Sequence, residues 1–138
     1  MLKSLNHKGQ IIKFPTPTQQ VILEAVSDIN PNDTFKFFIN RKGQYNLQKC
    51  TYLSRYKNIH NLLRIDIEGP PHDNPDGTTV QCPHIHIYKE GYNLSWAYPL
   101  PDHLPTDPTK LIDVLIDFLS YNNVKNVSDY SYQEGGLI

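Results

Sequence analysis

The stretch Leu-Arg-Ile-Asp-Ile-Glu at residues 63–68 decides the predicted fold, because apolar and charged side chains alternate along it without a break. Successive side chains of a β-strand point to opposite faces, so the isoleucines enter a core while Arg64, Asp66 and Glu68 share the other face. The same alternation returns in Pro-His-Ile-His-Ile-Tyr at residues 83–88. A turn-rich loop joins the two stretches, and we therefore expect them to pair as antiparallel strands with adjacent polar faces.

Around this pair the sequence predicts an antiparallel meander of about five strands, over residues 35–39, 45–53, 63–67, 85–87 and 94–98. An N-terminal helix is expected from Thr16 to Ile29, because Thr16 and Gln19 fit a capping box and apolar residues follow at helical spacing. A C-terminal helix is expected from Asp107 to Asn122, where a capping residue and a proline precede a face rich in leucine and isoleucine. The predicted fold class is therefore α+β, with a helix at each end of the meander.

Length and composition narrow the class of protein. The 138 residues suit one domain over 1–138, with loosely ordered ends at 1–14 and 128–138. A formal net charge of -1 excludes a strongly basic nucleic-acid binder and a polyanion mimic. No apolar run approaches the ~18 residues of a membrane span and the N-terminus lacks a signal-peptide core, so a cytoplasmic protein without a membrane partner is expected. Cys50 and Cys82 are then expected to be reduced thiols.

The densest cluster of chemically active side chains lies on and between the two central strands. His84, His86 and Tyr88 share the polar face of the later strand, Arg64 lies on that of the earlier strand, and His72 stands in the loop between them. These five residues are the candidate catalytic residues. We expect both strand histidines to project from an accessible polar face rather than from the core. A plain solvated sheet face is the alternative interpretation.

Three kinds of function fit this cluster. In the first, the two strand histidines and a third ligand, His72, Glu90 or His103, bind a divalent metal such as zinc. In the second, no cofactor is needed: one histidine takes the proton of an RNA 2′-hydroxyl, another protonates the leaving oxygen, and Arg64 or Lys89 stabilises the phosphorane. In the third, the face does no chemistry and binds a protein or a nucleic acid.

Two local patterns resemble motifs of known enzymes. His-Ile-His at residues 84–86 is similar to the His-hydrophobe-His motif of rolling-circle nickases, a resemblance that implies Tyr121 as the nucleophile. The chain has no clear third ligand in the nickase position. Residues 84–90, with Glu90 four positions after the second histidine, are similar to the first cupin motif, whereas the second cupin motif has no counterpart in the sequence.

A longer resemblance covers residues 34–100. Its motifs are Gly-Pro-Pro-His at 69–72, Asn-Pro-Asp-Gly at 74–77 and Pro-His-Ile-His-Ile-Tyr at 83–88. On these motifs the chain resembles an uncharacterised family of small bacterial and prophage proteins. The family carries no established activity. The resemblance implies a mobile-element or defence setting, such as a toxin–antitoxin locus or a phage accessory gene.

The favoured function at this point is action on nucleic acid by a histidine-dependent ribonuclease, with RNA or an antitoxin or defence protein as partner. The first alternative is a non-enzymatic inhibitor or regulator that binds a host or phage-defence protein. The second is a metal-dependent hydrolase or a nickase-like enzyme built on the His-x-His pattern. These expectations place the site on one strand pair, whichever chemistry it performs.

Overall fold

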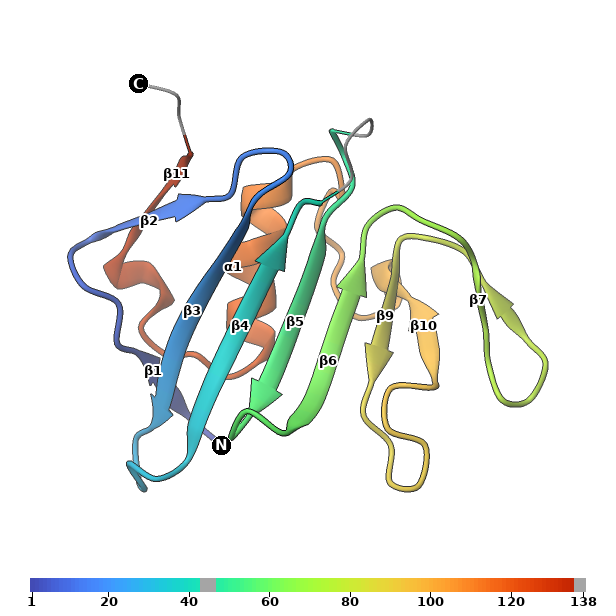
Figure 1. The fold of residues 1–138 in the computed structure, drawn as a ribbon, viewed down its shortest axis with the longest axis horizontal. Coiled ribbons are helices and arrows are strands. Elements are labelled where there is room, and N and C mark those ends of the chain that lie inside the picture. The colour runs from blue at the N-terminus through green and yellow to red at the C-terminus, as the bar shows by residue number, and fades with distance from the viewer. Residues whose placement is uncertain (43–46, 136–138) are drawn as a thin grey trace.

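The computed structural model describes residues 1–42 and 47–135. Its main sheet is antiparallel and contains β1 (Lys3–Leu5), β3 (Gln20–Ser27), β4 (Thr34–Asn40), β5 (Thr51–Tyr56), β6 (His60–Asp66), β9 (His84–Ile87) and β10 (Ala97–Pro99). These seven strands lie side by side in that order (Figure 1). Two smaller sheets pair β2 (Ile11–Phe14) with β11 (Ser131–Glu134) and β7 (His72–Asp73) with β8 (Thr79–Val80). One α-helix, α1 (Leu111–Tyr121), and the short helices η1 (Leu100–Asp102) and η2 (Val127–Asp129) complete the described elements.

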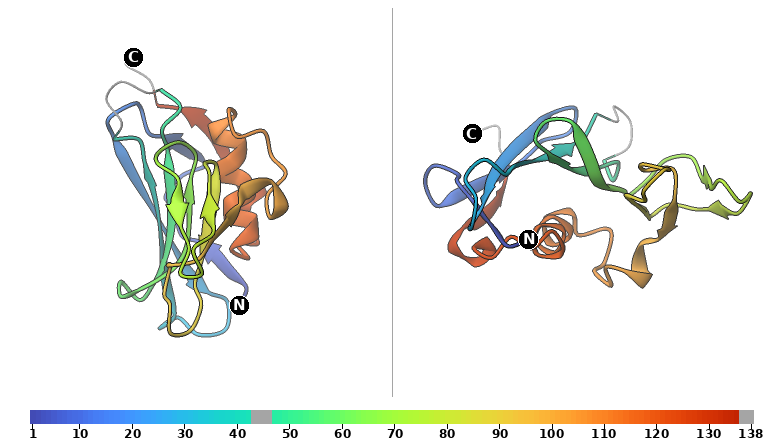
Figure 2. Two further views of the ribbon diagram at one scale, coloured as in Figure 1. Left: turned by 90° about the vertical axis from the view of Figure 1, so that its right-hand side faces the viewer. Right: turned by 90° about the horizontal axis from the view of Figure 1, so that it is seen from below.

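The hydrophobic core lies between one face of the main sheet and α1. We call this the inner face. It carries fully buried side chains such as Phe37, Tyr52, Ile65 and Ile85, and α1 packs Phe118 and its apolar neighbours against them. Alternation explains the arrangement, because every second residue of each strand points to this side. Figure 2 shows α1 and the β2–β11 pair on the same side of the sheet, and no helix of the described residues covers the opposite, outer face.

The predicted N-terminal helix is wrong, because residues 20–27 form the strand β3. Thr16 and Gln19 make a turn, in which the N–H of Gln19 donates to the carbonyl of Thr16, and Thr18 adopts a left-handed backbone. Leu23 and Ala25 point to the core while Ile22 lies largely exposed, a period of two rather than of 3.6. The β-branched residues of this segment favour a strand, and pairing with β4 satisfies its backbone.

The predicted α+β class, with a five-strand meander flanked by two helices, is also wrong, because the described residues are mostly β and contain a single α-helix. The antiparallel neighbours β4, β5, β6, β9 and β10 are present, but β3 and β1 extend their sheet to seven strands. The start of the second predicted strand, at residues 45 and 46, lies outside the described residues. The C-terminal helix is confirmed, although it begins at Leu111, because Asp107 caps a preceding turn through the N–H and hydroxyl of Thr109.

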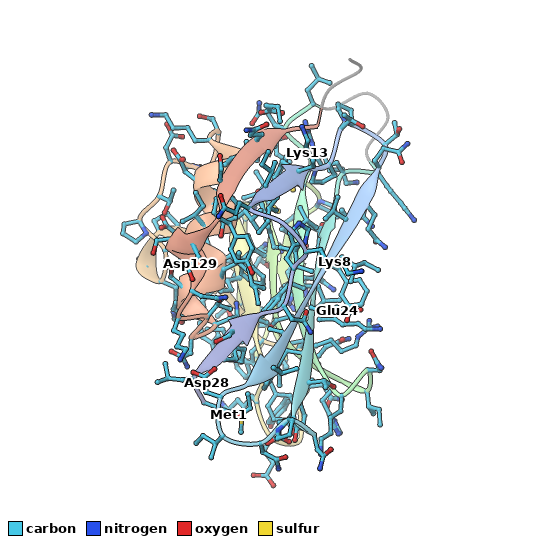
Figure 3. All side chains as sticks on the ribbon, turned by 90° about the vertical axis from the view of Figure 1, so that its left-hand side faces the viewer. Met1, Lys8, Lys13, Glu24, Asp28 and Asp129 are labelled. Carbon is cyan, nitrogen blue, oxygen red and sulfur yellow. The ribbon has the colours of Figure 1, made fainter. Side chains whose placement is uncertain are left out.

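Residues 1–14 and 128–135 carry more structure than the composition suggests, and residues 136–138 of the predicted loose C-terminal end lie outside the described residues. Residues 1–14 supply β1 and β2, and β11 at residues 131–134 pairs in parallel with β2. Figure 3 shows Asp129 on the side of α1, whereas Glu24 of β3 lies on the outer side of the sheet. Among the described residues, no helix combines the length and the apolar character that crossing a bilayer requires.

Candidate metal centre

The pairing of β6 with β9 builds the site. Arg64 lies opposite His86 and Asp66 opposite His84, which confirms that the two polar rows predicted from the sequence are adjacent. Ile65 and Ile85 are also partners in this ladder, and both are fully buried on the inner face. The apolar partners therefore fix the register, and the register places the charged side chains and imidazoles together on the outer face.

His84 is buried, with 2% of its surface exposed, rather than accessible as expected. Its Nδ1 lies 3.2 Å from the carbonyl oxygen of Val80, and its Nε2 lies 3.1 Å from Oδ2 of Asp66. A carbonyl oxygen only accepts hydrogen bonds, so Nδ1 carries the proton. In the neutral ring, Nε2 then carries a lone pair directed at the carboxylate.

His86 repeats this arrangement two residues later. It is 1% exposed, its Nδ1 donates to the carbonyl of Leu94 at 2.8 Å, and its Nε2 lies 3.3 Å from the same Oδ2 of Asp66. Nη2 of Arg64 lies 3.0 Å from this Nε2 and donates to its lone pair. Backbone carbonyls thus fix the tautomer and the orientation of both rings, an outer-shell arrangement typical of histidines that bind metals.

Asp66 is the shared partner of both imidazoles. Arg64 donates to its Oδ2 from Nη2 at 3.1 Å, and the hydroxyl of Thr51 lies 3.4 Å from its Oδ1. Burial raises the pKa of Asp66, but a hydrogen bond from His86 when its Nε2 is protonated, together with the guanidinium of Arg64, outweighs burial and holds that pKa well below its usual range. The carboxylate is therefore ionised at neutral pH.

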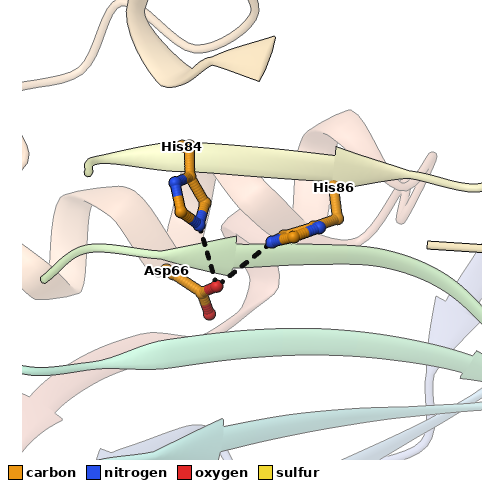
Figure 4. Close-up of side chains that lie close together, drawn as sticks. All are labelled: Asp66, His84 and His86. Atoms are coloured by element: carbon orange, nitrogen blue, oxygen red, sulfur yellow. Dashed lines mark hydrogen bonds and ion pairs between the residues drawn. The ribbon is translucent and has the colours of Figure 1, made fainter. Parts of the chain in front are cut away.

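Three electron-rich atoms converge at this point (Figure 4). Ligand atoms of Asp66, His84 and His86 all lie within 4.8 Å of one another. With both rings neutral, two nitrogen lone pairs and a carboxylate oxygen repel one another, and either a proton on an imidazole or a nearby cation relieves that repulsion. In the structure the guanidinium of Arg64, whose side chain is 39% exposed, lies against Asp66 and His86. A divalent ion would satisfy all three ligands at once.

A cavity of about 280 Å³ opens next to this triad. Its wall includes the cations Lys49 and Arg64, the carboxylate of Glu68, and His72 from β7. Nε2 of His72 lies 2.7 Å from the carbonyl oxygen of Ser95, and its ring centroid lies 4.6 Å from that of His86. The structure thus brings four of the five predicted catalytic residues together: His72, His84, His86 and Arg64.

The loop from residue 69 to residue 83 covers the site, and a buried asparagine clamps it. Nδ2 of Asn74 donates to the carbonyl of Ala97 at 3.0 Å, and the N–H of Ala97 donates back to Oδ1 at 2.8 Å. Residues 74–77 form a turn, in which the N–H of Gly77 donates to the carbonyl of Asn74. This clamp and the contact of His72 with Ser95 tie the loop to the chain around β10.

Other sequence candidates lie elsewhere. Tyr88 is 44% exposed and does not line the cavity, and Glu90 is exposed beyond it. Nδ1 of His103 lies 3.1 Å from the hydroxyl of Tyr121. Tyr121 ends α1, the helix on the inner face, whereas the triad lies on the outer face, so it is poorly placed to serve as a nickase nucleophile.

The sequence prediction left several polar side chains of the site out of the candidate residues, among them Asp66, Lys49 and Thr51. Asp66 was predicted to lie on the polar face but was not selected as a ligand. The signal was present in the alternation of residues 63–68, because a register that pairs Ile65 with Ile85 also pairs Asp66 with His84. Lys49 and Thr51 reach the cavity through the pairing of Thr51 with Asp66 across β5 and β6, which no local motif indicates.

The model of DUF6978, a family of unknown function, matches residues 1–124. No curated protein and no solved structure matches the chain. The match includes the whole site and extends well beyond the motifs on which the resemblance rested. The chain belongs to the DUF6978 family of unknown function.

Proposed function

We propose that Asp66, His84 and His86 bind a divalent cation and that the protein is a metal-dependent ribonuclease. The observation that carries this proposal is the orientation of the two rings. Each Nδ1 donates to a backbone carbonyl, and each Nε2 points at the same oxygen of Asp66. Burial of both rings keeps this geometry in place before any ligand arrives.

The spacing of the ligand atoms favours zinc. Two ligands at about 2.0–2.1 Å from a tetrahedral zinc ion lie about 3.3 Å from each other. Oδ2 of Asp66 lies 3.1 Å from Nε2 of His84 and 3.3 Å from Nε2 of His86. Three protein ligands leave a fourth position open, as in catalytic rather than structural zinc sites. The adjacent cavity gives a substrate access to that position.

The walls of the cavity suit a phosphate group. A cation at the triad supplies a Lewis acid for a phosphoryl oxygen. Arg64 and Lys49 place two positive charges in the lining, beside the carboxylates of Asp66 and Glu68, and these two cations can neutralise charge that develops on the transferring group. RNA carries its own nucleophile: the 2′-oxygen bonds to the adjacent phosphorus as the bond to the 5′-oxygen breaks. The 2′-hydroxyl loses one proton and the 5′-oxygen gains one, leaving a 2′,3′-cyclic phosphate and a 5′-hydroxyl.

The geometry favours this version over metal-free acid–base cleavage by the two strand histidines. In-line displacement at phosphorus places the attacking and leaving oxygens on opposite sides, so a base and an acid must also stand on opposite sides. His84 and His86 instead direct their Nε2 atoms to one oxygen of Asp66. The prophage or toxin–antitoxin setting remains a prediction from the sequence resemblance.

The test is cleavage of a labelled single-stranded RNA by purified protein that has been treated with a chelator and then supplied with zinc, manganese or magnesium. His86→Asn is the informative variant, because an asparagine amide can still donate to Leu94 but offers no ligand at the position of Nε2. His103→Asn, purified identically, is the matched control away from the triad. We expect metal-dependent cleavage by the wild type and His103→Asn only. Cleavage that survives both the chelator and His86→Asn would overturn the proposal.

A further inference from the structure

The outer face of the main sheet leads directly to the metal centre. Its side chains form a row across five strands, in which each residue is the ladder partner of the next: Ile22, Phe38, Leu53, Arg64 and His86. α1 and the β2–β11 pair lie on the other side of the sheet (Figure 2), so neither covers this row, whereas the loop from residue 69 to residue 83, with its β7–β8 pair, covers the row at His86. An extended ligand lying on this row would reach Arg64 and the cavity beside it.

The row combines stacking surface with positive charge. The guanidinium carbon of Arg55 lies 4.6 Å from the ring centroid of Phe38, and Lys36 is the ladder partner of Arg55. Glu24, the ladder partner of Lys36, balances part of this charge at the β3 side of the face (Figure 3), and Asp66 pairs with Arg64 at the β6 side. Aromatic rings flanked by arginine and lysine match the bases and phosphates of an unpaired strand, whose bases are free to stack.

A second aromatic cluster lies beyond the metal centre, in the hairpin that follows β9. Nζ of Lys89 lies 4.9 Å from the ring centroid of Trp96 and 5.7 Å from that of Tyr92. Tyr88 and Tyr92 are 44% and 45% exposed, large values for aromatic rings. The same hairpin supplies the carbonyl that orients His86. Aromatic and basic groups therefore flank the triad on both sides.

We infer that the substrate is single-stranded RNA, which lies across the outer face with its bases on Phe38 and on the Tyr88–Tyr92 hairpin and its cleaved phosphate at the triad. The choice of RNA rests on the proposed function, whereas the single-stranded form rests on these surfaces. A duplex keeps its bases stacked on each other and offers no free base to either aromatic cluster. Arg55 and Lys89 contact phosphates on either side of the cleaved bond.

The test measures binding apart from cleavage, by fluorescence anisotropy of a labelled 12-nucleotide RNA in the presence of a chelator. We expect the wild type to bind with an affinity that falls as salt rises. Tyr92→Ala and Phe38→Ala should each weaken binding by about 5- to 100-fold, the range of one lost stacking contact. Tyr92→Phe keeps the ring, and Ile59→Ala alters an exposed turn between β5 and β6, so both should bind like the wild type.

Several outcomes would overturn this inference, and the binding results are separate from the cleavage results that test the proposed function. If the wild type binds a duplex of the same sequence as tightly, or if Tyr92→Ala and Phe38→Ala bind like Tyr92→Phe, the surface does not hold a single strand. Metal-dependent cleavage together with unchanged binding by both alanine variants would sustain the ribonuclease and remove this surface. Specific binding without any cleavage would sustain this surface and remove the ribonuclease. Thermal melting shows whether Phe38→Ala is folded. Tyr92→Ala tests the same surface independently, at a side chain that is exposed.

Discussion

Oδ2 of Asp66 on β6 lies 3.1 Å from Nε2 of His84 on β9, and the two residues are direct partners in the ladder between these strands. A slip of one residue in this ladder would send Asp66 into the core and bring Ile65 to the outer face. The site therefore depends on the same pairing that builds the core. Stability and function are coupled here through the register of two strands.

The first prediction concerns that register. Ile85→Ala removes a fully buried side chain at the centre of the β6–β9 pair, so the free energy of unfolding should fall by about 2–5 kcal/mol. Urea denaturation measures the loss. Ile59→Ala, in an exposed turn, should change it by no more than about 0.5 kcal/mol. Equal stability of the two variants would mean that Ile85 does not anchor the strand pair.

The second prediction concerns the buried histidines. His84→Ala leaves the carbonyl of Val80 without its donor and should cost about 1–3 kcal/mol of unfolding free energy. His84→Asn can retain that donor and should cost less. Because both rings are buried, alanine variants confound loss of activity with loss of fold, and asparagine variants separate the two. If His84→Ala proves as stable as the wild type, the ring contributes nothing to the packing.

The third prediction concerns Arg64, whose guanidinium now lies against the ligand atoms. Arg64→Gln removes a positive charge that competes with the ion, and such a charge within a few ångströms is worth more than 1 kcal/mol. Zinc should therefore bind at least about tenfold more tightly while RNA cleavage slows. Arg55→Gln removes the same charge from the neighbouring strand and should leave zinc affinity nearly unchanged. Weaker zinc binding by Arg64→Gln would show that Arg64 supports the triad rather than competing with the metal.

The fourth prediction concerns the two thiols. Burial raises the pKa of Cys50 to about 11, whereas the thiol of an unfolded chain has a pKa of about 8.5. Folding therefore favours the protonated thiol of Cys50. The contribution of this thiol to the free energy of unfolding is complete below about pH 8.5 and is lost as the pH rises toward 11. We expect the melting temperature to fall across that range.

At pH 8, iodoacetamide followed by mass spectrometry should find Cys82, which is partly exposed, modified before Cys50. Faster modification of Cys50 would contradict this burial.

The sequence predicted the strand pair of the site because that pair depends on local alternation. Residues 63–68 and residues 83–88 each show a strict period of two, and two buried isoleucines can align in few ways. The segment that became β3 is different, because its apolar residues satisfy both a helical and a strand period. Pairing with β4 decides its structure, and that pairing joins residues up to 20 positions apart.

Burial of the triad could not be predicted in the same way. His84 and His86 alternate with isoleucines and are polar, so a local pattern places them on an exposed face. They are buried because the loop from residue 69 to residue 83 folds over them and is clamped by Asn74 to β10. The turn residues in this loop indicate a change of direction, but not the side of the sheet to which the loop returns.

Zinc binding to protein first stripped with a chelator is the measurement that tests the central claim most directly. Isothermal titration should show one ion per chain for the wild type and for His103→Asn. Loss of a direct ligand in Asp66→Asn, His84→Asn or His86→Asn should weaken binding by more than about 100-fold, beyond the effect of an outer-shell change. If the wild type takes up no zinc, or if the three triad variants bind it like His103→Asn, then Asp66, His84 and His86 do not form a metal centre.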